Sequence, residues 1–559
     1  MKITKTITFT LSVLVATAAN GQGFEGMADE NRVVDLTLDS LEKANTMRPV
    51  SGSSRKGDNP VLFLVGNSTM RTGTQGNGDN GQWGWGYFAH KYFDANKITV
   101  ENHALGGTSS RTFYTYLWPD VKKGIRAGDY VIIELGHNDN GPFDSGRCRA
   151  TIKGTSPTDS LVVTLKEGPR EGQQETVYSY GEYMRRYIRE TRALGAYPIL
   201  MSLTPRKRPL RGMDNGQLTM DNGGWEAVRV NETFGLWARQ VAEELNVPFV
   251  DLNELSAAKY DGMSSWKLNY HFYLDNIHTS KFGAELNARS AAEGIAASTH
   301  PELKPLQAMQ VNLALPTTGV RREAGKPVVF ITGDSTVKNA DKDSTGMWGW
   351  GSQAWRIFDE DKITYINCAQ AGRSSRTYLK EGRWDKVYND LQPGDFVLIQ
   401  FGHNNIGELH RGKHRGEIPG TADTSCVSRV ETATEHINEV VYSFGWYLKK
   451  FIDDCREKGA TPILVSLTPR NEWPDGEHIE RRNDSFGKWY REVAAETGCE
   501  FLDLHNITAD ALDRTGRDAA RLFYNNDHTH TSLAGARLNA LNIAEGLRRN
   551  NSPLAKYLK

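Results

Sequence analysis

Residues 327–337 read PVVFITGDSTV, an apolar run that ends abruptly in a Gly-Asp-Ser-Thr turn carrying Ser335. The β-branched run predicts a buried strand of a parallel sheet. Open α/β sheets bind ligands in the crevice beyond the carboxyl ends of their strands, so a serine on this turn would face that crevice. The same construction occurs earlier, where residues 60–69 read PVLFLVGNST and Ser68 takes the place of Ser335.

The rest of the chain repeats in the same way. Residues 178–206 read YSYGEYMRRYIRETRALGAYPILMSLTPR and match residues 442–470, YSFGWYLKKFIDDCREKGATPILVSLTPR, without a gap. Four further pairs follow in the same order: GQWGWG (81–86) with GMWGWG (346–351), ENHALGGTSSRTF (101–113) with INCAQAGRSSRTY (366–378), GDYVIIELGHND (128–139) with GDFVLIQFGHNN (394–405), and HTSKFGAELNA (278–288) with HTSLAGARLNA (530–540). Ordered self-similarity of this quality indicates a tandem duplication.

Length and pattern together predict two domains of the α/β class. A chain of 559 residues is too long for a single hydrophobic core. Each copy alternates five apolar strands with helical stretches, which predicts a parallel central sheet with helices on both faces in each of two domains. We expect the first domain over residues 59–300 and the second over 325–559, joined by a linker at 301–324 that contains three prolines. Residues 23–58 form a leader that the sequence does not assign.

The N-terminus reads as an export signal over residues 1–22. Two lysines precede an apolar run at 7–18 that is too short to span a bilayer. We therefore expect an exported protein, periplasmic or secreted, without a membrane span. A formal net charge of -1 argues against nucleic acid as a partner. The five cysteines allow at most two disulfides and show no zinc-binding spacing.

A serine hydroxyl becomes a good nucleophile only when a base takes its proton. The base is usually a histidine that a carboxylate orients. Each copy has an Asp-x-x-His sequence directly before its last helix, with Asp275 and His278 in the first copy and Asp527 and His530 in the second. Strand ends of a parallel sheet share one edge, so we expect each histidine to meet the serine of its own copy, Ser68 or Ser335.

Ester hydrolysis also needs hydrogen-bond donors for the oxyanion. The candidates are Gly107 and Asn138 in the first copy and Gly372 and Asn404 in the second, each at a predicted strand end. Asparagine at such a position is often only a turn former. Here it converges with serine and histidine on the same sheet edge, which favours a functional role.

These blocks resemble the SGNH (GDSL-like) hydrolase superfamily, and within it the rhamnogalacturonan acetylesterase group. The second copy carries GDST, AGRSSRT, GHNN and DHTH, and the first carries GNST, GGTSSRT, GHND and DNIH. The resemblance covers nearly all of both copies. It implies two three-layer α/β/α, flavodoxin-like domains and a serine esterase that needs no metal or other cofactor. Ser68, Asp275 and His278, and likewise Ser335, Asp527 and His530, would be nucleophile, orienting acid and base, while Gly107, Asn138, Gly372 and Asn404 would line the oxyanion holes.

Two positions depart from the family pattern. Asn67 stands where the second copy has Asp334, which makes the first site the more doubtful one. Asn405 stands where the first copy has Asp139. The second of these positions is outside the expected catalytic residues, so we give it less weight.

Aromatic and basic residues near the serines suggest substrate contacts. Trp83 and Trp348 follow the two serines and either pack the first helix against the sheet or form a sugar platform. Arg111 and Arg376 lie just past the oxyanion glycines and form either a structural ion pair or a site for a sugar carboxylate. Long insertions after the asparagine blocks differ between the copies, and the first of them (153–170) resembles a hairpin. This divergence predicts different ester preferences at the two sites.

The sequence therefore predicts an exported serine esterase that removes acetyl groups from an acetylated pectic polysaccharide through an acyl-enzyme. Because the histidine must be neutral to act as a base, we expect activity to rise between about pH 6 and 7. One alternative is a lipase, thioesterase or methylesterase of the same superfamily. Another is one active domain beside a carbohydrate-binding domain with a decayed site. The oligomeric state is left open.

Overall fold

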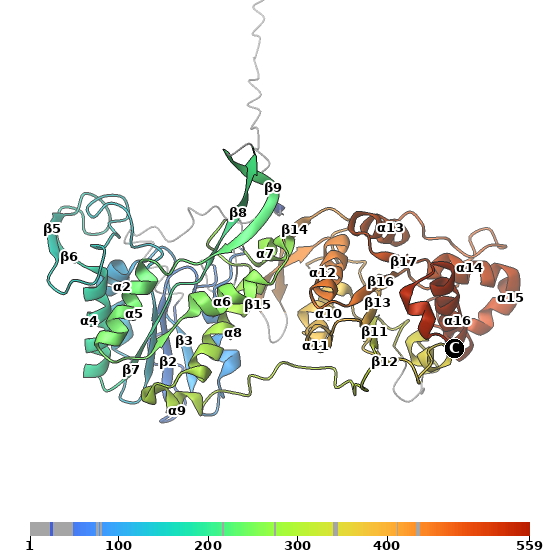
Figure 1. Ribbon diagram of the computed structural model, residues 1–559, viewed down its shortest axis with the longest axis horizontal. Coiled ribbons are helices and arrows are strands. Elements are labelled where there is room, and N and C mark those ends of the chain that lie inside the picture. The colour runs from blue at the N-terminus through green and yellow to red at the C-terminus, as the bar shows by residue number, and fades with distance from the viewer. Residues whose placement is uncertain are drawn as a thin grey trace, which may run out of the picture.

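The computed structural model shows two α/β domains side by side (Figure 1). It describes residues 23–25, 48–73, 78, 81–214, 217–272, 275–338, 345–410, 412–431 and 436–559. The export signal expected at 1–22 and most of the leader expected at 23–58 lie outside the described residues. Among the described helices, none combines the length and the apolar character needed to cross a membrane.

The first domain is built on a five-stranded parallel sheet in the order β10-β7-β4-β2-β3. Its strands are β2 (Val61–Gly66), β3 (Thr99–Asn102), β4 (Tyr130–Glu134), β7 (Tyr197–Met201) and β10 (Phe249–Val250). The chain starts at β2, moves outward to β3, and then crosses to β4 on the other side. The order of strands thus reverses between β2 and β4, which is where doubly wound sheets bind their ligands.

The second domain repeats this sheet strand for strand, in the order β12-β11-β13-β16-β17. Its strands are β11 (Val328–Gly333), β12 (Thr364–Asn367), β13 (Phe396–Gln400), β16 (Thr461–Val465) and β17 (Glu500–Leu502). All pairings within the two sheets are parallel. The prediction of two domains with parallel central sheets is confirmed.

Helices cover both faces of each sheet. In the first domain they are α2 (Ser110–Tyr116), α3 (Trp118–Lys122), α4 (Tyr180–Ala193), α5 (Phe234–Glu244), α6 (Leu252–Asp261), α7 (Ser265–His271) and α8 (Lys281–Ala297). In the second they are α10 (Ser375–Lys380), α11 (Arg383–Asp390), α12 (Phe444–Glu457), α13 (Phe486–Thr497), α14 (Leu504–Thr515), α15 (Arg517–Ala520) and α16 (Leu533–Arg549). Alternate residues of β2 enter two different core clusters, because successive side chains of a strand point to opposite faces.

The segment between the domains is divided between them. The short helix α9 (Lys304–Gln307) packs its Leu306 into the core of the first domain. Further along, Arg322 forms an ion pair of 2.5 Å with Asp395 of the second domain. The expected linker is therefore anchored at both ends.

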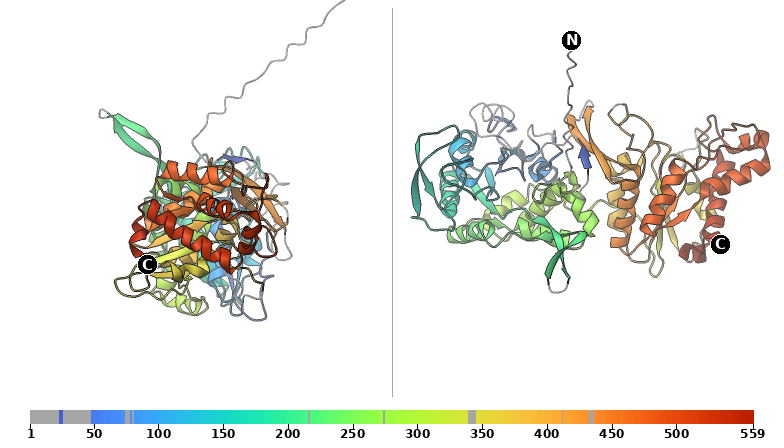
Figure 2. Two further views of the ribbon diagram at one scale, coloured as in Figure 1. Left: turned by 90° about the vertical axis from the view of Figure 1, so that its right-hand side faces the viewer. Right: turned by 90° about the horizontal axis from the view of Figure 1, so that it is seen from above.

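Three β-hairpins lie outside the sheets. One hairpin is formed by β5 (Ser160–Thr164) and β6 (Gln174–Tyr178); its first strand lies in the segment 153–170 that was predicted as a hairpin, and its second strand lies beyond that segment. Strands β14 (Thr424–Glu431) and β15 (His436–Tyr442) form its counterpart in the second domain. Strand β1 (Gly23–Glu25) pairs with β14. The third hairpin, β8 (Arg206–Asp214) with β9 (Gln217–Val228), was not predicted from the sequence and projects from the body of the molecule (Figure 2).

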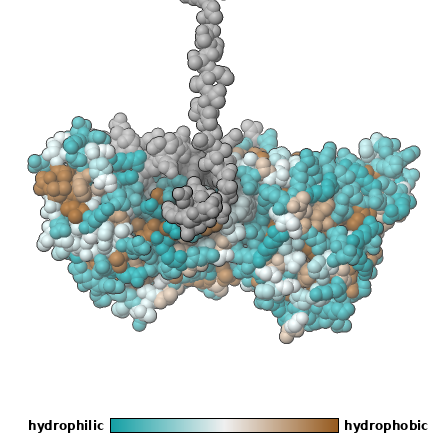
Figure 3. All heavy atoms as spheres, turned by 45° about the horizontal axis from the view of Figure 1, so that its top comes forward, coloured by the Kyte–Doolittle hydropathy of each residue, from teal (hydrophilic) through white to brown (hydrophobic). Residues whose placement is uncertain are grey.

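Figure 3 shows a hydrophobic patch at the outer end of the first domain, where β5 exposes Leu161 and Val162.

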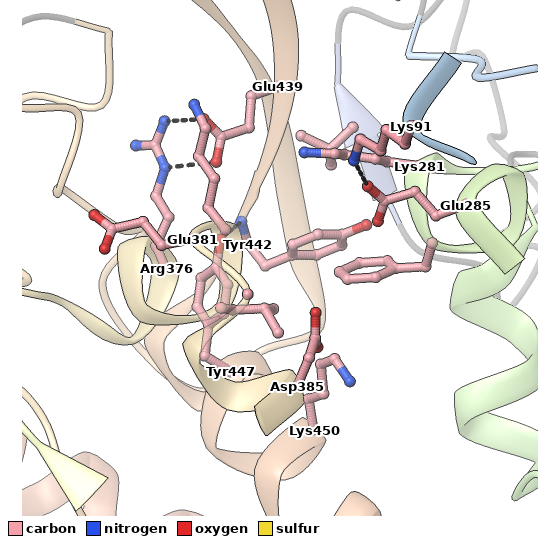
Figure 4. Close-up of a pocket in the computed structure, with 15 residues that line it drawn as sticks. Lys91, Lys281, Glu285, Arg376, Glu381, Asp385, Glu439, Tyr442, Tyr447 and Lys450 are labelled. Carbon is pink, nitrogen blue, oxygen red and sulfur yellow. Dashed lines mark hydrogen bonds and ion pairs between the residues drawn. The ribbon is translucent and has the colours of Figure 1, made fainter. Parts of the chain in front are cut away.

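The two domains meet along α7 and α12. Lys267 of α7 lies 2.7 Å from Asp454 of α12, and both side chains are buried. The ring of Trp446 packs against Tyr270 and Phe282 of the first domain. A cavity of about 300 Å³ remains between the domains and is lined from both sides (Figure 4). Neither Ser68 nor Ser335 lines this cavity, so the expected chemistry lies elsewhere.

Candidate active site

Ser68 lies on a tight turn directly after β2, at the point where the strand order reverses. The carbonyl oxygen of Asn67 accepts the N–H groups of Met70 and Arg71 at 3.2 and 2.9 Å, which closes the turn. The hydroxyl oxygen of Ser68 lies 2.7 Å from Nε2 of His278. The 210 residues that separate the two in the chain are bridged because both lie at the carboxyl edge of one sheet.

The imidazole of His278 is held from its other side. Its Nδ1 is hydrogen-bonded to the carboxylate of Asp275, whose second oxygen accepts the N–H groups of Ile277 and His278 at 2.7 Å each. Burial alone would raise the pKa of Asp275, but the hydrogen bonds from His278 and from these N–H groups lower it to about 2. Asp275 is therefore ionised at neutral pH.

The second domain repeats this arrangement around Ser335. Nε2 of His530 lies 2.9 Å from the hydroxyl oxygen of Ser335, and its Nδ1 lies 2.6 Å from Asp527. Asp527 also accepts the N–H groups of Thr529 and His530 at 2.7 Å each. The nearby His528 is directed instead towards Glu472, at 3.6 Å. The structure thus brings together the three predicted side chains in both domains, in a geometry that lets the imidazole take the hydroxyl proton.

The second site is more open than the first. The Asp527 side chain is 40% exposed, against 9% for Asp275, and His530 is 26% exposed, against 12% for His278. Electrostatic interactions weaken as solvent enters a site. The same three groups therefore act in a drier environment in the first domain.

The candidate oxyanion residues lie at neighbouring strand ends. Gly107 and Gly372 adopt φ of 77° and 75°, a left-handed conformation that favours glycine in this turn. Asn138 donates from its amide nitrogen to the carbonyl oxygen of Thr108 at 3.0 Å. In the second domain, the amide oxygen of Asn404 accepts from Arg415 at 2.6 Å, which leaves its NH₂ group facing away from that arginine. An oxyanion role for these residues stays a prediction.

The structure corrects the predicted substrate role of the two arginines. Arg111 is 1% exposed and donates to both carboxylate oxygens of Glu175, at 3.0 and 3.1 Å. Arg376 is equally buried and pairs in the same way with Glu439, at 3.1 and 3.0 Å (Figure 4). Each also donates to two backbone carbonyl groups. The structural ion pair, which the sequence left open, is the alternative observed.

The tryptophans divide between the two alternatives. Trp83 is fully buried and stacks on Phe88 with ring centroids 5.5 Å apart, so it packs in the core and does not form a sugar platform. Trp348 is partly exposed, and its backbone pairs with Thr531. A substrate contact by Trp348 stays a prediction.

Several residues that the sequence reading passed over lie at the site. A cleft of about 480 Å³ in the first domain is lined by Ser68, His278 and Asn138 and also by Arg147 and Arg149. The sequence indicates these residues by a repeated basic pair, which stands at 147 and 149 in the first copy and at 413 and 415 in the second. Among the described residues, no group of three or more His, Cys, Asp or Glu side chains could hold a metal ion. All five cysteines are described, and none is in a disulfide.

Both halves of the chain are similar to known proteins. Two models described as GDSL-like lipase/acylhydrolase match the chain in tandem, over residues 62–290 and 331–538. A rhamnogalacturonan acetylesterase of Emericella nidulans is 34% identical over 226 residues, which are 40% of this chain and 86% of that protein. The rhamnogalacturonan acetylesterase RhgT of Bacillus subtilis is 29% identical over 248 residues, 42% of this chain and 95% of that protein.

Among solved structures, Axe2, an acetylxylan esterase from Geobacillus stearothermophilus, aligns with a TM-score of 0.27 and 19% identity, over 43% of this chain and 96% of that one. Each relative spans about one of the two copies. The tandem matches, the identity to the fungal relative and the coverage of its length lead to one assignment. The chain belongs to the GDSL-like lipase/acylhydrolase family, a family of serine esterases, and carries two copies of its domain.

Proposed function

We propose that the protein removes acetyl groups from pectic polysaccharide of the rhamnogalacturonan type. The observation that carries the proposal is the alignment of hydroxyl, imidazole and carboxylate in both domains, with Ser68 and Ser335 each within 2.9 Å of a histidine. The acetylated carbohydrate as substrate is inferred from relatives named rhamnogalacturonan acetylesterases. The basic and apolar start of the chain favours export to the compartment where such polymers occur.

The proposed reaction runs through an acetyl-enzyme. His278 takes the proton of Ser68 as its oxygen attacks the acetyl carbonyl, and Asp275 stabilises the imidazolium that forms. The backbone N–H groups of Ser68 and Gly107 and the amide of Asn138 would stabilise the oxyanion. The imidazolium then protonates the leaving sugar oxygen. Water, deprotonated by the same histidine, cleaves the acetyl-enzyme and releases acetate. Ser335, His530 and Asp527 would act in the same order.

The geometry favours two active sites over one active site and one binding domain. The contact between serine and histidine is 2.7 Å in the first domain and 2.9 Å in the second. The first domain, despite Asn67, thus has the same contact between serine and histidine as the second.

The test is acetate release from acetylated pectin by the wild type, Ser68→Ala, Ser335→Ala and the double variant. We expect each single variant to retain the activity of the other domain and the double variant to lose all release. A chain-length series of 4-nitrophenyl esters distinguishes the lipase alternative, which requires a preference for long acyl groups. Unchanged release by Ser68→Ala on every substrate would exclude a catalytic first domain.

A further inference from the structure

The cleft of the first domain contains two arginines that the proposed reaction does not use. Arg147 and Arg149 line the same cavity of about 480 Å³ as Ser68 and His278. They lie on the loop after β4, in the segment that follows Asn138. A group bound between them would therefore sit beside the acyl group under attack.

Among the residues that the structure describes, neither arginine pairs with an acidic side chain. Within the part of the chain that the structure describes, Arg147 forms no ion pair or hydrogen bond. Arg149 reaches only the carbonyl oxygen of Gly107, at 3.5 Å. Burial and the charge of Arg147 lower the pKa of Arg149, whereas Asp139 raises it. The carboxylate of Asp139 is buried and accepts from Ser110 and Thr151, so it does not pair with either guanidinium.

Two neighbouring cations in a partly buried cleft repel each other and are poorly solvated. An anion that enters the cleft relieves both costs, and a guanidinium matches a carboxylate with two parallel hydrogen bonds. We propose that Arg147 and Arg149 bind the carboxylate of a uronic acid unit next to the acetyl ester in the first domain. The inference rests on the proposed function, because it names the part of the polysaccharide that this site reads.

The second domain does not repeat the pair. Arg415, at the position of Arg149, donates to the carbonyl oxygen of Gly372 at 2.9 Å and to the amide oxygen of Asn404 at 2.6 Å. Lys413, at the position of Arg147, is exposed, and the nearby cavity is also lined by Glu408. A lysine is a point charge without the planar fork of arginine. The preference for an acidic sugar is therefore specific to the first domain.

Binding provides the first test and does not depend on turnover. The Ser68→Ala/Ser335→Ala double variant is titrated with galacturonate and with galactose by calorimetry. We expect galacturonate to bind more tightly, and Arg147→Gln or Arg149→Gln to weaken it about 10- to 100-fold, the range for a lost charge-assisted hydrogen bond. Added salt should weaken galacturonate binding more than galactose binding. Equal affinities for the two sugars would overturn the proposal.

Kinetics provides the second test. In the Ser335→Ala background, the ratio of kcat/KM for an acetylated galacturonate over its neutral methyl ester is measured. Arg147→Gln and Arg149→Gln should lower this ratio about 10- to 100-fold. Lys413→Gln in the Ser68→Ala background is the matched control, and its ratio should not change. An unchanged ratio in both arginine variants refutes the carboxylate site. Absence of turnover on any ester refutes the proposed function instead and leaves the binding test decisive.

Discussion

The two domains keep a buried acid at the same place but supply it from different residues. In the first, Asp139 accepts the N–H of Ser110 at 3.1 Å and the hydroxyl of Thr151 at 3.2 Å. In the second, Asn405 stands at the position of Asp139, and Glu417 stands at that of Thr151. Glu417 accepts the hydroxyl of Ser375 at 2.7 Å and the N–H of Arg376 at 2.7 Å. Each acid joins the start of the helix that follows Gly107 or Gly372 to the loop that follows Asn138 or Asn404.

The position of a buried acid is also exchanged between the domains beneath the turns that carry Ser68 and Ser335. Asn67 precedes Ser68, and the fully buried Glu134 at the end of β4 accepts the hydroxyl of Thr69 at 3.0 Å. In the second domain the acid is Asp334, next to Ser335, and accepts from Thr336 at 2.8 Å. The position of Glu134 is occupied there by Gln400, which accepts from Trp350 at 2.8 Å.

These exchanges teach that a departure from a motif has to be interpreted in three dimensions. Asn67 and Asn405 each look like a lost charge when the chain is read residue by residue. In the structure, an acid on a neighbouring element accompanies each of them. Two acids in one buried cluster would repel each other. A cluster with no acid would leave its buried donors without an acceptor. Asn67 therefore marks a change in which residue carries the acid, and by itself is no sign of a decayed site.

The strongest test of equivalence between the domains is removal of each base. His278→Ala should lower kcat of the first domain about 10³-fold, and His530→Ala should do the same in the second, because the serine proton then has no acceptor. Each is measured with the serine of the other domain replaced by alanine. A loss confined to one domain would show that the two sites are not alike in chemistry.

A change beside the predicted oxyanion residue Asn404 should have a smaller effect on kcat, and the effect should be confined to the second domain. Arg415→Ala removes the charged donor that orients Asn404, a contact worth about 1.5–3 kcal/mol, so kcat should fall about 10-fold or more with little change in KM. Arg415→Lys keeps the charge but loses the planar guanidinium, so its kcat should lie between that of the unchanged enzyme and that of Arg415→Ala. The rates are measured in the Ser68→Ala background. A kcat that stays at the level of that background would mean that Asn404 does not depend on Arg415.

The exchange of Asp139 for Glu417 can be tested by building the acid of one domain into the other. Asp139→Asn should lower the free energy of unfolding by about 1–3 kcal/mol, because buried donors lose an acceptor. The double variant Asp139→Asn/Thr151→Glu reproduces the second domain and should recover most of this loss. Asn405→Asp alone places a second acid beside Glu417 and should therefore lower the free energy of unfolding. Chemical denaturation measures all three, and a double variant no better than the single one would contradict the exchange.

Burial also makes the contribution of Glu134 to stability depend on pH. Burial raises the pKa of Glu134 to about 8, although hydrogen bonds from Thr69 and Trp85 oppose the shift. A glutamate in the unfolded chain ionises near pH 4.3, so the unfolded state gains stability by ionisation while the folded state does not. This group therefore makes the free energy of unfolding fall as pH rises from about 4.5 to 8.

Glu134→Gln should remove that fall, so its stability relative to the wild type should increase with pH over this window. Gln400→Glu in the second domain is the matched variant and should show the opposite slope. Urea unfolding at a series of pH values measures both. Parallel stability curves for the wild type and Glu134→Gln would contradict a raised pKa at this position.

Much of the molecule follows from local sequence. The duplication, the five strands of each sheet and the longest helices, such as α4 and α8, are visible as repeated motifs, buried β-branched runs and helical periodicity. The pairing of Ser68 with His278 could be anticipated because parallel strands bring their carboxyl ends to one edge. The hairpin β8–β9 was missed because its strands alternate weakly, although an Asn-Gly pair at 215–216 is a hairpin signal in the sequence.

Only the tertiary structure decided which charged groups are free. Arg111 and Arg147 are both arginines in polar stretches near a strand end, yet Glu175 from a distant hairpin neutralises the first and nothing described neutralises the second. The acid exchanges depend in the same way on residues 12 or more positions apart, such as Thr151 and Asp139. Sequence determines which elements form, because propensity and periodicity act locally. Partners of buried charges are decided by folding, because they come from segments that meet only once the chain is packed.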